Sequence, residues 1–474
     1  MSFKTASLAV IVLAAGKGTR MSSSVPKVLH ELRSRPLLDH VLDAAQGLDP
    51  GKIIVVTGQG GGQVQDLVAQ RKEPIQVVIQ EPQLGTGHAV AQCLDSLKGP
   101  EGIVAVLSGD VPRLGTGTVI SLYQAVSGEG AAVSVLTGRI GDPAGYGRIL
   151  RDQDGKVTGI REHRDLAPGQ EDIDEVNFGV YAFDAAFLRE ELPKLKNANA
   201  QGEYYLTDII GTAATTGRTV ATRTLEDPNE ARGINTLREL AEMEREMNRS
   251  HLEKLMAAGV RIVDPERTWI DDTVTVGPDT VIYPSVFLHG QSSVGSGCII
   301  RPGAVITDTV IGDRVEIRPY CVITGSAISD DAAIGPFAHL RAGSEIGPSA
   351  RIGNFVETKK AVIGEGSKVS HLTYVGDAEL GRGVNIGAGC VTCNYDGFNK
   401  YRTVIEDGVF VGSGTMLVAP VTLGKGSLVG AGSTVTADVP PDALAVSRAH
   451  QSVKEGWAAR RRARLTGAEG EDRD

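Results

Sequence analysis

Short aliphatic runs alternate with longer polar stretches through residues 1–227. The runs are rich in Val, Ile and Leu, which is typical of strands that are buried on both faces of a parallel sheet. The clearest runs are Leu8–Leu13, Ile53–Thr57, Gln76–Gln80, Val104–Leu107 and Ala132–Leu136. Strands that alternate with helix-compatible segments indicate βαβ units. The pattern therefore predicts an α/β domain whose mostly parallel sheet is covered on both faces.

Residues 228–258 have a different pattern, in which apolar residues recur at helical spacing among many charges. The recurring positions are Leu237, Leu240, Met243, Met247, Leu252, Leu255 and Met256. This spacing predicts one long amphipathic helix or two short ones. We interpret the segment as a helical linker between two domains.

Residues 259–474 contain a repeat with a period of six. From residue 264 on, Ile-Gly, Leu-Gly and Val-Gly dipeptides follow one another at intervals within one residue of a multiple of six. Such a hexapeptide repeat predicts a triangular coil in which each side is a short strand and an aliphatic residue points inward. Three hexads would close one coil, so that equivalent positions recur every 18 residues or so, and roughly ten coils fit before residue 446. The segment is therefore an all-β parallel helix.

Two segments do not fit the repeat. Cys393–Arg402 is polar and aromatic, and we expect it to leave the coil wall as a loop. Glu455–Asp474 carries four arginines and then an acidic end, which predicts a solvated and mostly disordered tail.

Composition narrows the function classes. The chain has 474 residues, a net charge of −10 and only 4% aromatic residues, so a general nucleic-acid binder is not expected. No apolar run is long enough to cross a membrane. The five cysteines are too scattered for a disulfide framework, which favours a reducing, cytoplasmic location.

The first candidate site is the stretch Leu13–Met21, which follows the first strand. Its glycines allow backbone N–H groups to approach a phosphate, and Lys17, Arg20 and Lys27 add positive charge. The stretch lacks the third glycine of a dinucleotide fingerprint and the Gly-Lys-Ser/Thr end of a P-loop. We interpret it as a triphosphate site. The alternative is an ordinary turn between a strand and a helix with solvated basic residues.

Asp110 follows the strand Val104–Leu107, at the edge where open α/β sheets bind ligands. Its carboxylate is suited to holding Mg²⁺ against nucleotide phosphates. The alternative is a helix N-cap. Gln80 precedes a second Gly-rich loop and has the donor and acceptor that the edge of a uracil requires.

The second candidate site lies in the repeat. Arg341 and Lys359 are 18 residues apart, so they should stack on the same edge of the coil, where a phosphate would relieve their repulsion. His371 should lie on a different face, and would meet these cations only across a cleft between neighbouring subunits. A trimer is the natural closed assembly of a three-sided prism. Glu357 is a candidate for orienting the imidazole.

These residues resemble two halves of a known family, the bacterial bifunctional N-acetylglucosamine-1-phosphate uridylyltransferases/glucosamine-1-phosphate N-acetyltransferases. The first-half motifs are Leu13–Met21 with Pro26-Lys27, Gln80, Gly85-Thr86, Ser108-Gly109-Asp110 and Tyr146-Gly147-Arg148. The second-half motifs are Gly353–Lys360, His371–Tyr374, Asn385–Gly389 and Cys393–Gly397. The resemblance covers nearly the whole chain up to Trp457. It implies a Rossmann-like nucleotidyltransferase domain followed by a left-handed parallel β-helix.

For the first half, the resemblance implies uridylyl transfer from UTP to N-acetylglucosamine 1-phosphate with Mg²⁺ as cofactor. Catalytic cations would be Arg20 and Lys27, and the metal ligands Asp110 and Asn235. Nucleotide and sugar would be bound by Leu13, Ala14, Ala15, Gly16, Lys27, Gln80, Gly85, Thr86, Gly147, Glu162, Asn177 and Asn235. The family often has Tyr where this chain has Ser108.

For the second half, the resemblance implies acetylation of glucosamine 1-phosphate by acetyl-CoA, with His371 as general base. The acceptor would be bound by Arg341, Lys359, Tyr374 and Asn385. Acetyl-CoA would be bound by Ala388, Asn394, Tyr395, Ser413, Ala431 and Arg448. Two rival hypotheses remain: a monofunctional sugar-1-phosphate nucleotidyltransferase with a regulatory or structural β-helix, and an inactive assembly protein that binds sugar nucleotides.

Overall fold

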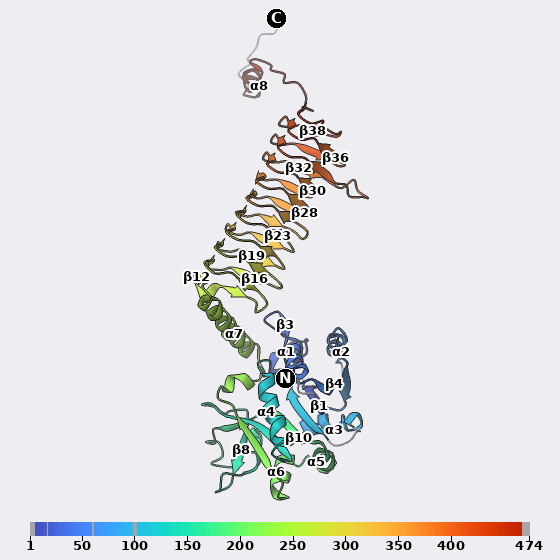
Figure 1. Ribbon diagram of the computed structural model, residues 1–474, viewed down its shortest axis with the longest axis vertical. Coiled ribbons are helices and arrows are strands. Elements are labelled where there is room, and N and C mark those ends of the chain that lie inside the picture. Colours follow the sequence, from blue (N-terminus) through green and yellow to red (C-terminus); the bar gives the residue numbers. More distant parts are fainter. Residues whose placement is uncertain (1–4, 17, 59–60, 98–101, 467–474) are drawn as a thin grey trace. The chain divides into compact units, whose positions relative to one another are not determined.

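The structure is a computed structural model that describes residues 5–16, 18–58, 61–97 and 102–466 (Figure 1). The chain divides into two compact units, Met1–Glu246 and Met247–Asp474. The limits 1–227 and 259–474 that the sequence pattern suggests for the two functional domains stay a prediction.

The first unit is built on a nine-stranded sheet with the order β11-β7-β10-β6-β1-β4-β5, to which β8 and β9 are added beside β10. Its strands are β1 (Thr5–Ala14), β4 (Pro50–Gly58), β5 (Ile75–Gln80), β6 (Ile103–Ser108), β7 (Val133–Arg139), β8 (Gly147–Arg151), β9 (Val157–Arg161), β10 (Glu175–Asp184) and β11 (Val220–Thr224). Strand β1 pairs in parallel with β4 and β6, as the apolar runs predict. Strand β10 is antiparallel to β6 and β7, a reversal that the sequence pattern did not reveal.

Helices cover both faces of this sheet, which confirms the α/β prediction. They are α1 (Leu37–Gln46), α2 (Gly62–Ala69), α3 (Thr86–Ala91), α4 (Thr116–Ser127), α5 (Ala185–Glu191) and α6 (Asp208–Thr215). Val10 and Val12 of β1 pack in one core with α1, α2 and α4, whereas Ile11 packs in the other with α3, α5 and α6. Alternate residues of one strand thus enter opposite cores, which explains its continuous hydrophobicity.

A single long helix, α7 (Leu237–Ala257), forms most of the predicted linker. A short 3-10 turn, η6 (Pro228–Ala231), precedes it. Of the two arrangements that the sequence left open, one long helix is therefore the one observed. The boundary between the two compact units falls inside this helix.

The second unit is a parallel β-helix, as the hexapeptide repeat predicts. One face is an 11-stranded sheet of β12 (Arg261–Ile262), β15 (Val281–Ile282), β18 (Ile299–Ile300), β21 (Glu316–Ile317), β24 (Ala333–Ile334), β27 (Arg351–Asn354), β29 (Lys368–His371), β31 (Asn385–Ile386), β34 (Phe410–Val411), β37 (Leu428–Val429) and β39 (Leu444–Ala445). We call it the C face.

The remaining strands form a 17-stranded sheet that supplies the other faces. They are β13 (Trp269–Ile270), β14 (Thr275–Val276), β16 (Phe287–His289), β17 (Ser293–Val294), β19 (Val305–Thr307), β20 (Val310–Ile311), β22 (Val322–Thr324), β23 (Ala327–Ile328), β25 (His339–Leu340), β26 (Glu345–Ile346), β28 (Glu357–Ile363), β30 (Tyr374–Leu380), β32 (Val391–Cys393), β33 (Thr403–Ile405), β35 (Met416–Val418), β36 (Val421–Leu423) and β38 (Thr434–Val435).

The interior of the β-helix is a column of aliphatic side chains. Ile300, Ile317 and Ile334 on successive C-face strands are fully buried, and their strands pair in register. The coil length varies, because Val322 pairs with His339 after 17 residues whereas Leu340 pairs with Thr358 after 18. The repeat is thus slightly shorter than three full hexads in some coils.

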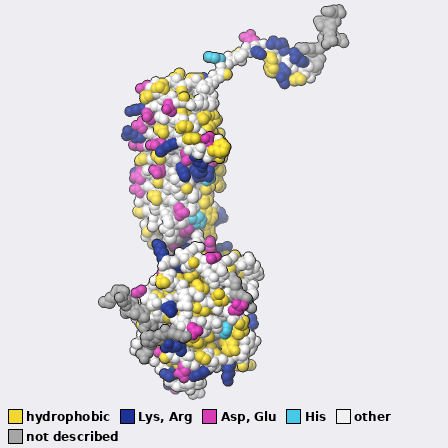
Figure 2. Space-filling view, turned by 90° about the vertical axis from the view of Figure 1, so that its right-hand side faces the viewer, with side chains coloured by type: hydrophobic (Ala, Val, Ile, Leu, Met, Phe, Trp, Pro, Cys, Tyr) yellow, Lys and Arg dark blue, Asp and Glu magenta, His cyan; other side chains and the backbone are white. Residues whose placement is uncertain are grey.

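The loop prediction for Cys393–Arg402 is confirmed. The chain leaves the coil after β32 and returns at β33, and the tip residue Phe398 is 92% exposed. The tail prediction is partly wrong, because α8 (Trp457–Leu465) is a helix. Alanine, arginine and leucine are strong helix formers, and its arginines remain exposed (Figure 2). Within the described residues, no helix is long and apolar enough to cross a membrane.

Candidate functional site

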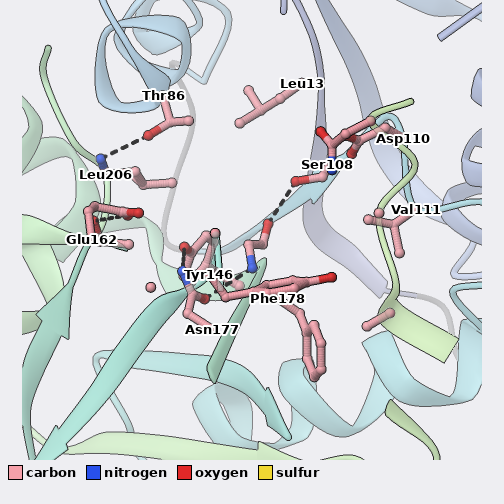
Figure 3. A pocket seen from close by; sticks show the side chains of 18 residues that line it. Leu13, Thr86, Ser108, Asp110, Val111, Tyr146, Glu162, Asn177, Phe178 and Leu206 are labelled. Carbon is pink, nitrogen blue, oxygen red and sulfur yellow. Dashed lines mark hydrogen bonds between the residues drawn. The ribbon is translucent and has the colours of Figure 1, made fainter. Parts of the chain in front are cut away.

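A pocket of about 220 Å³ opens at the carboxyl ends of β1 and β6 in the first unit (Figure 3). It brings together residues that are far apart in the sequence. Among the predicted site residues, those lining it are Leu13, Thr86, Asp110, Gly147, Glu162, Asn177 and Asn235. Asp110 and Glu162 lie on opposite sides of the pocket in the close view. This is the edge at which open α/β sheets bind ligands.

Two predicted cations lie at the Asp110 side of this pocket. Lys27, in the 3-10 turn η2 (Lys27–Leu29), forms a short ion pair with Asp110. Its Nζ also donates to Asn235 Oδ1 at 3.1 Å, and the Arg20 guanidinium donates to the same oxygen at 2.7 Å. Four predicted residues therefore form one contact cluster. Lys17, the third predicted cation, lies outside the described residues.

Asn235 is held by the start of α7. Glu239 accepts hydrogen bonds from the backbone N–H groups of Asn235 at 2.6 Å and Thr236 at 3.2 Å. In return, the Thr236 hydroxyl accepts from the Glu239 N–H at 3.2 Å. This reciprocal pair is a capping box, which satisfies backbone donors at the helix start. Glu239 is not among the predicted site residues, although Thr236-x-x-Glu239 is a capping signal that the sequence shows.

A second pocket, of about 320 Å³, adjoins the first. Five predicted nucleotide residues besides Leu13 line it: Ala15, Gly16, Gln80, Gly85 and Thr86. Ala14 is buried in the same core as Val10 and Val12 and does not line this pocket. Gln83, which the sequence analysis missed, also lines the pocket and donates to the Ala15 carbonyl at 2.5 Å, so that it ties the two Gly-rich loops together.

Gly85 is required where it stands. Its φ of +102° is unfavourable for side-chain-bearing residues, and an added Cβ would lie 2.7 Å from the Tyr204 carbonyl oxygen. The Gln80 amide donates to the Gly85 carbonyl at 2.9 Å and contacts His88 Nδ1 at 3.1 Å. Within the described part of the chain, the Gln80 side-chain oxygen accepts no hydrogen bond, which leaves an acceptor for a ligand beside a tightly fixed loop.

Glu162 and Asn177 form the opposite wall. Glu162 accepts a hydrogen bond from the Thr207 hydroxyl at 2.8 Å. Burial raises the pKa of the Glu162 carboxyl above its usual range, and the Thr207 hydrogen bond offsets this in part. The Asn177 amide donates to the Tyr181 hydroxyl at 2.7 Å, and its oxygen accepts from the Gly179 N–H at 3.0 Å. Both polar groups are therefore pre-positioned on the pocket wall.

Ser108 stands where the family often has Tyr. Its hydroxyl donates to the Gly179 carbonyl at 3.2 Å and so bridges β6 to β10. The following aspartate keeps its place at the pocket edge. The substitution therefore leaves the Asp110 carboxylate and its contacts intact.

The residues at the Asp110 side fit a magnesium ion. The Asp110 carboxylate and the Asn235 amide oxygen are both hard oxygen ligands, and a single ammonium group already contacts both. Within the described residues, no group of three or more His, Cys, Asp or Glu side chains is placed to hold a metal. Magnesium sites with few protein ligands are completed by water and substrate phosphates.

In the β-helix, Arg341 and Lys359 align as predicted. The Arg341 N–H donates to the Thr358 carbonyl at 2.9 Å, which places Arg341 directly beside Lys359 in the next coil. Lys400, from the projecting loop, contacts Lys359 as well. The pKa of the Lys359 ammonium is lowered, first by Lys400 and then by Arg341. Three cations thus converge at one corner, and the sequence analysis missed the third.

Within one chain, Glu357 lies with Arg341 and not with His371, so its role in orienting an imidazole stays a prediction for the contact between two copies. Its carboxylate accepts a hydrogen bond from Arg341 at 2.9 Å. The His371 Nδ1 instead lies 2.6 Å from Asn354 Oδ1. Asn354 and His371 pair in register on β27 and β29, one coil apart. Because the amide oxygen only accepts, the His371 Nδ1–H donates and Nε2 is left as the basic nitrogen.

His371 heads a column of small residues. The backbone N–H groups of Gly389, Gly414 and Gly432 donate to His371, Ala388 and Ser413, so that these residues and Ala431 occupy equivalent positions at one corner. The three glycines have φ near +70°, and an added Cβ would meet nothing closer than 3.9 Å. At the same corner in earlier coils, Tyr320, Phe337, Phe355 and Leu372 project instead. From Gly389 on, this corner therefore carries small residues, whereas the four preceding coils carry large apolar ones.

The other predicted acetyltransferase residues divide between two places. Tyr374 begins β30, and its hydroxyl reaches over Gly376, which is in register with Lys359. Asn394 hydrogen-bonds Asp377 at the base of the loop that carries Tyr395 and Lys400. These residues belong with the Lys359 corner.

The remaining residues belong with His371. Asn385 lies on the C face beside Lys368, and the Arg448 guanidinium donates to the Ala431 carbonyl at 2.5 Å. Lys359 and His371 thus occupy different corners of one chain, as the coil arithmetic predicts.

Comparison with known proteins agrees with the division of the chain into two units. Residues 10–173 match the MobA-like NTP transferase domain, and residues 273–308 and 402–437 match the six-repeat bacterial transferase hexapeptide family. The bifunctional protein GlmU of Trichlorobacter lovleyi is 48% identical over 96% of this chain and 98% of its own. That of Corynebacterium glutamicum is 46% identical over 98% of this chain and 96% of its own.

The chain belongs to the GlmU family. The relatives span both units, so the resemblance noted from the motifs is confirmed over nearly the whole chain. As a GlmU protein, the chain is a bifunctional transferase: a uridylyltransferase in its first unit and an acetyltransferase in its β-helix. The hypothesis of an inactive assembly protein is not supported.

Proposed function

We propose that the first unit joins UTP to N-acetylglucosamine 1-phosphate at the pocket between Asp110 and Glu162. A phosphate oxygen of the sugar phosphate attacks the α-phosphorus of UTP in line, and pyrophosphate leaves. Lys27 and Arg20 neutralise the negative charge that builds up on the phosphates. Asp110 and Asn235 would hold Mg²⁺, which supplies further charge neutralisation to the same phosphates.

The proposed substrate orientation follows from the two adjoining pockets. The uridine occupies the pocket of Gln80, Gly85 and Thr86, where the Gln80 side-chain oxygen accepts a hydrogen bond from the N–H on the uracil edge. The sugar occupies the pocket of Gly147, Glu162 and Asn177. The observation that supports this orientation is that Asp110 and Asn235 line the sugar pocket and hold Lys27 and Arg20 beside it, where the phosphates would be placed.

The β-helix acetylates the amine of glucosamine 1-phosphate in this proposal. Arg341, Lys359 and Lys400 bind the phosphate, and Tyr374 and Asn385 bind the sugar. His371 Nε2 takes a proton from the amine as its nitrogen attacks the thioester carbonyl of acetyl-CoA. The tetrahedral intermediate collapses, the C–S bond breaks, and the leaving sulfur takes the proton back from the His371 imidazolium, so that CoA leaves as a thiol and His371 is restored as a base. Acetyl-CoA lies along Ala388, Ser413 and Ala431, with Asn394, Tyr395 and Arg448 around it.

A complete acetyltransferase site needs more than one copy of the chain. His371 and Lys359 stand at different corners, so a second copy must bring the Lys359 corner to the His371 corner. A closed trimer does this three times over with one kind of interface. We place this trimer in the cytoplasm, a reducing compartment that suits the five free cysteines.

The proposal is tested by identifying products. The full chain is incubated with glucosamine 1-phosphate, acetyl-CoA, UTP and Mg²⁺, and the products are analysed by mass. We expect UDP-N-acetylglucosamine, pyrophosphate and free CoA. Formation of pyrophosphate only when N-acetylglucosamine 1-phosphate is supplied, without CoA release from glucosamine 1-phosphate, would favour the monofunctional alternative.

The trimer is tested by mixing subunits. Variants His371→Ala and Lys359→Ala are each expected to be inactive in acetyl transfer. If each site takes one corner from each of two copies, random mixed trimers recover about a quarter of the activity. A mixture that remains inactive, although it forms trimers, would mean that both residues act from the same copy.

A further inference from the structure

Both oxygen groups proposed for Mg²⁺ are already engaged by cations of the same chain. Lys27 Nζ contacts Asp110 Oδ2 and Asn235 Oδ1, and Arg20 contacts Asn235 Oδ1. We propose that Lys27 is a built-in substitute for the metal: its ammonium fills the metal position in the enzyme without nucleotide, and leaves when nucleotide and metal enter together. This inference rests on the function proposed for the same pocket.

The contacts of the ammonium make the two occupants mutually exclusive. An ion that bridges Asp110 and Asn235 must stand between the two oxygens, where Nζ now lies within hydrogen-bond distance of both. Magnesium binds its oxygen ligands at about 2.0–2.1 Å, so it leaves no room for a second cation between them. Repulsion between the two positive charges at such short range adds to the exclusion.

The need for a substitute follows from the position of Asp110. Its side chain is only 19% exposed, and that of Lys27 only 15%. A carboxylate in this position without a partner would carry a desolvation penalty. Lys27 removes that penalty in the free enzyme. The phosphates of an incoming nucleotide offer the ammonium a new counter-ion, so that a metal ion is then able to take over at Asp110.

Lys27 is anchored in a way that permits this exchange. The backbone of η2 is fixed on both sides of the residue, because the Leu29 N–H donates to the Pro26 carbonyl and the His30 N–H to the Lys27 carbonyl. Val28, the next residue, is buried in the core. The exchange therefore needs only rotation of the flexible lysine stem, whose ammonium acts as a point charge toward either partner.

A measurable consequence is weak metal binding by the enzyme alone. When a competing group occupies a site, the observed affinity falls in proportion to the fraction of molecules in which the site is free. If Lys27 fills the position in nine molecules of ten, its removal strengthens metal binding roughly tenfold. A lysine that merely stabilised the fold beside the metal would have no such effect.

The test measures Mn²⁺ binding to the full chain without nucleotide, by electron paramagnetic resonance of the free ion. Lys27→Met and Lys27→Gln are compared with Lys52→Met, which removes the same charge from an exposed lysine that donates to the Ser96 carbonyl. We expect Mn²⁺ to bind both Lys27 variants at least about tenfold more tightly than wild type, and Lys52→Met to stay within about twofold. Thermal melts establish that each variant is folded.

Two further measurements locate the ion. Asp110→Asn in the Lys27→Met background should abolish the gain. In wild type, UTP should strengthen Mn²⁺ binding, and Asp110→Asn should remove that effect. If the folded Lys27 variants bind Mn²⁺ no more tightly than Lys52→Met does, the proposal that Lys27 takes the place of the metal is wrong. If UTP has no effect through Asp110 in wild type, the metal site proposed above fails instead. The Gln variant keeps a hydrogen-bond donor, so it serves if the Met variant does not fold.

Discussion

Replacing Asn354 by alanine removes the hydrogen bond that orients the His371 ring. In the wild-type chain this bond spans 2.6 Å and fixes the proton on Nδ1, so that Nε2 is free to act as a base. Without it, the ring is free to rotate and to adopt the other tautomer. We therefore expect acetyl transfer to slow while the fold and uridylyl transfer are unaffected.

The magnitude follows from the strength of one hydrogen bond in this setting. A typical intramolecular hydrogen bond contributes about 0.5–1.5 kcal/mol net, and His371 is exposed, which favours the lower half of this range. Because about 1.4 kcal/mol corresponds to a factor of ten in rate, the expected loss in kcat is about two- to fivefold.

The assay follows CoA release and pyrophosphate release from the same preparation across a range of pH. A second variant, Asn354→Asp, keeps an acceptor at the same position, so it should retain most of the CoA release that Asn354→Ala loses. Wild-type CoA release by Asn354→Ala at every pH would refute this role, as would an equal loss of pyrophosphate release.

Three other outcomes are expected. Burial raises the pKa of the Glu162 carboxyl, so the stability that the protonated carboxyl contributes is present below a pH of about 4.5, its usual pKa, and is lost as the pH rises through the raised pKa. Glu162→Gln should therefore raise the melting temperature more at pH 8 than at pH 4, and an equal change at both pH values would contradict this. Binding of glucosamine 1-phosphate should raise the lowered pKa of the Lys359 ammonium, so that the protein takes up protons when the ligand binds at alkaline pH. Calorimetry in two alkaline buffers of different ionisation enthalpy should detect this uptake in wild type and not in Lys359→Met. Equal proton uptake in the variant would contradict the role of Lys359. Ile334→Ala leaves a cavity in the aliphatic column and should cost about 2–4 kcal/mol in urea unfolding, whereas a loss below about 1 kcal/mol would show that the column collapses around it.

The periodic parts of the fold were readable from sequence because each residue meets a local requirement. Ile317 and Ile334 point inward because of their place in a hexad, and β1 is apolar throughout because both of its faces are covered. The antiparallel direction of β10 was not readable, because its own residues are equally suited to either direction. The helix α8 was missed because its charges conceal any apolar period.

Site residues could be predicted from the sequence where they come directly after a strand, or where they lie one coil length from another site residue. Asp110 was found at the end of β6, and Lys359 one coil beyond Arg341. Lys400 was missed because the loop that carries it has no period from which its direction follows. Asn354 lies 17 residues before His371, and an assumed interval of 18 passes over it.

The central claim is that one chain carries two independent active sites, and complementation of two variants tests it most directly. His371→Ala is predicted to convert N-acetylglucosamine 1-phosphate but not glucosamine 1-phosphate to UDP-N-acetylglucosamine. Asp110→Asn is predicted to release CoA and to stop at N-acetylglucosamine 1-phosphate. A mixture of the two should again make UDP-N-acetylglucosamine from glucosamine 1-phosphate, because the intermediate made by one variant is a substrate for the other. Failure of the mixture, or loss of CoA release in Asp110→Asn, would contradict the account.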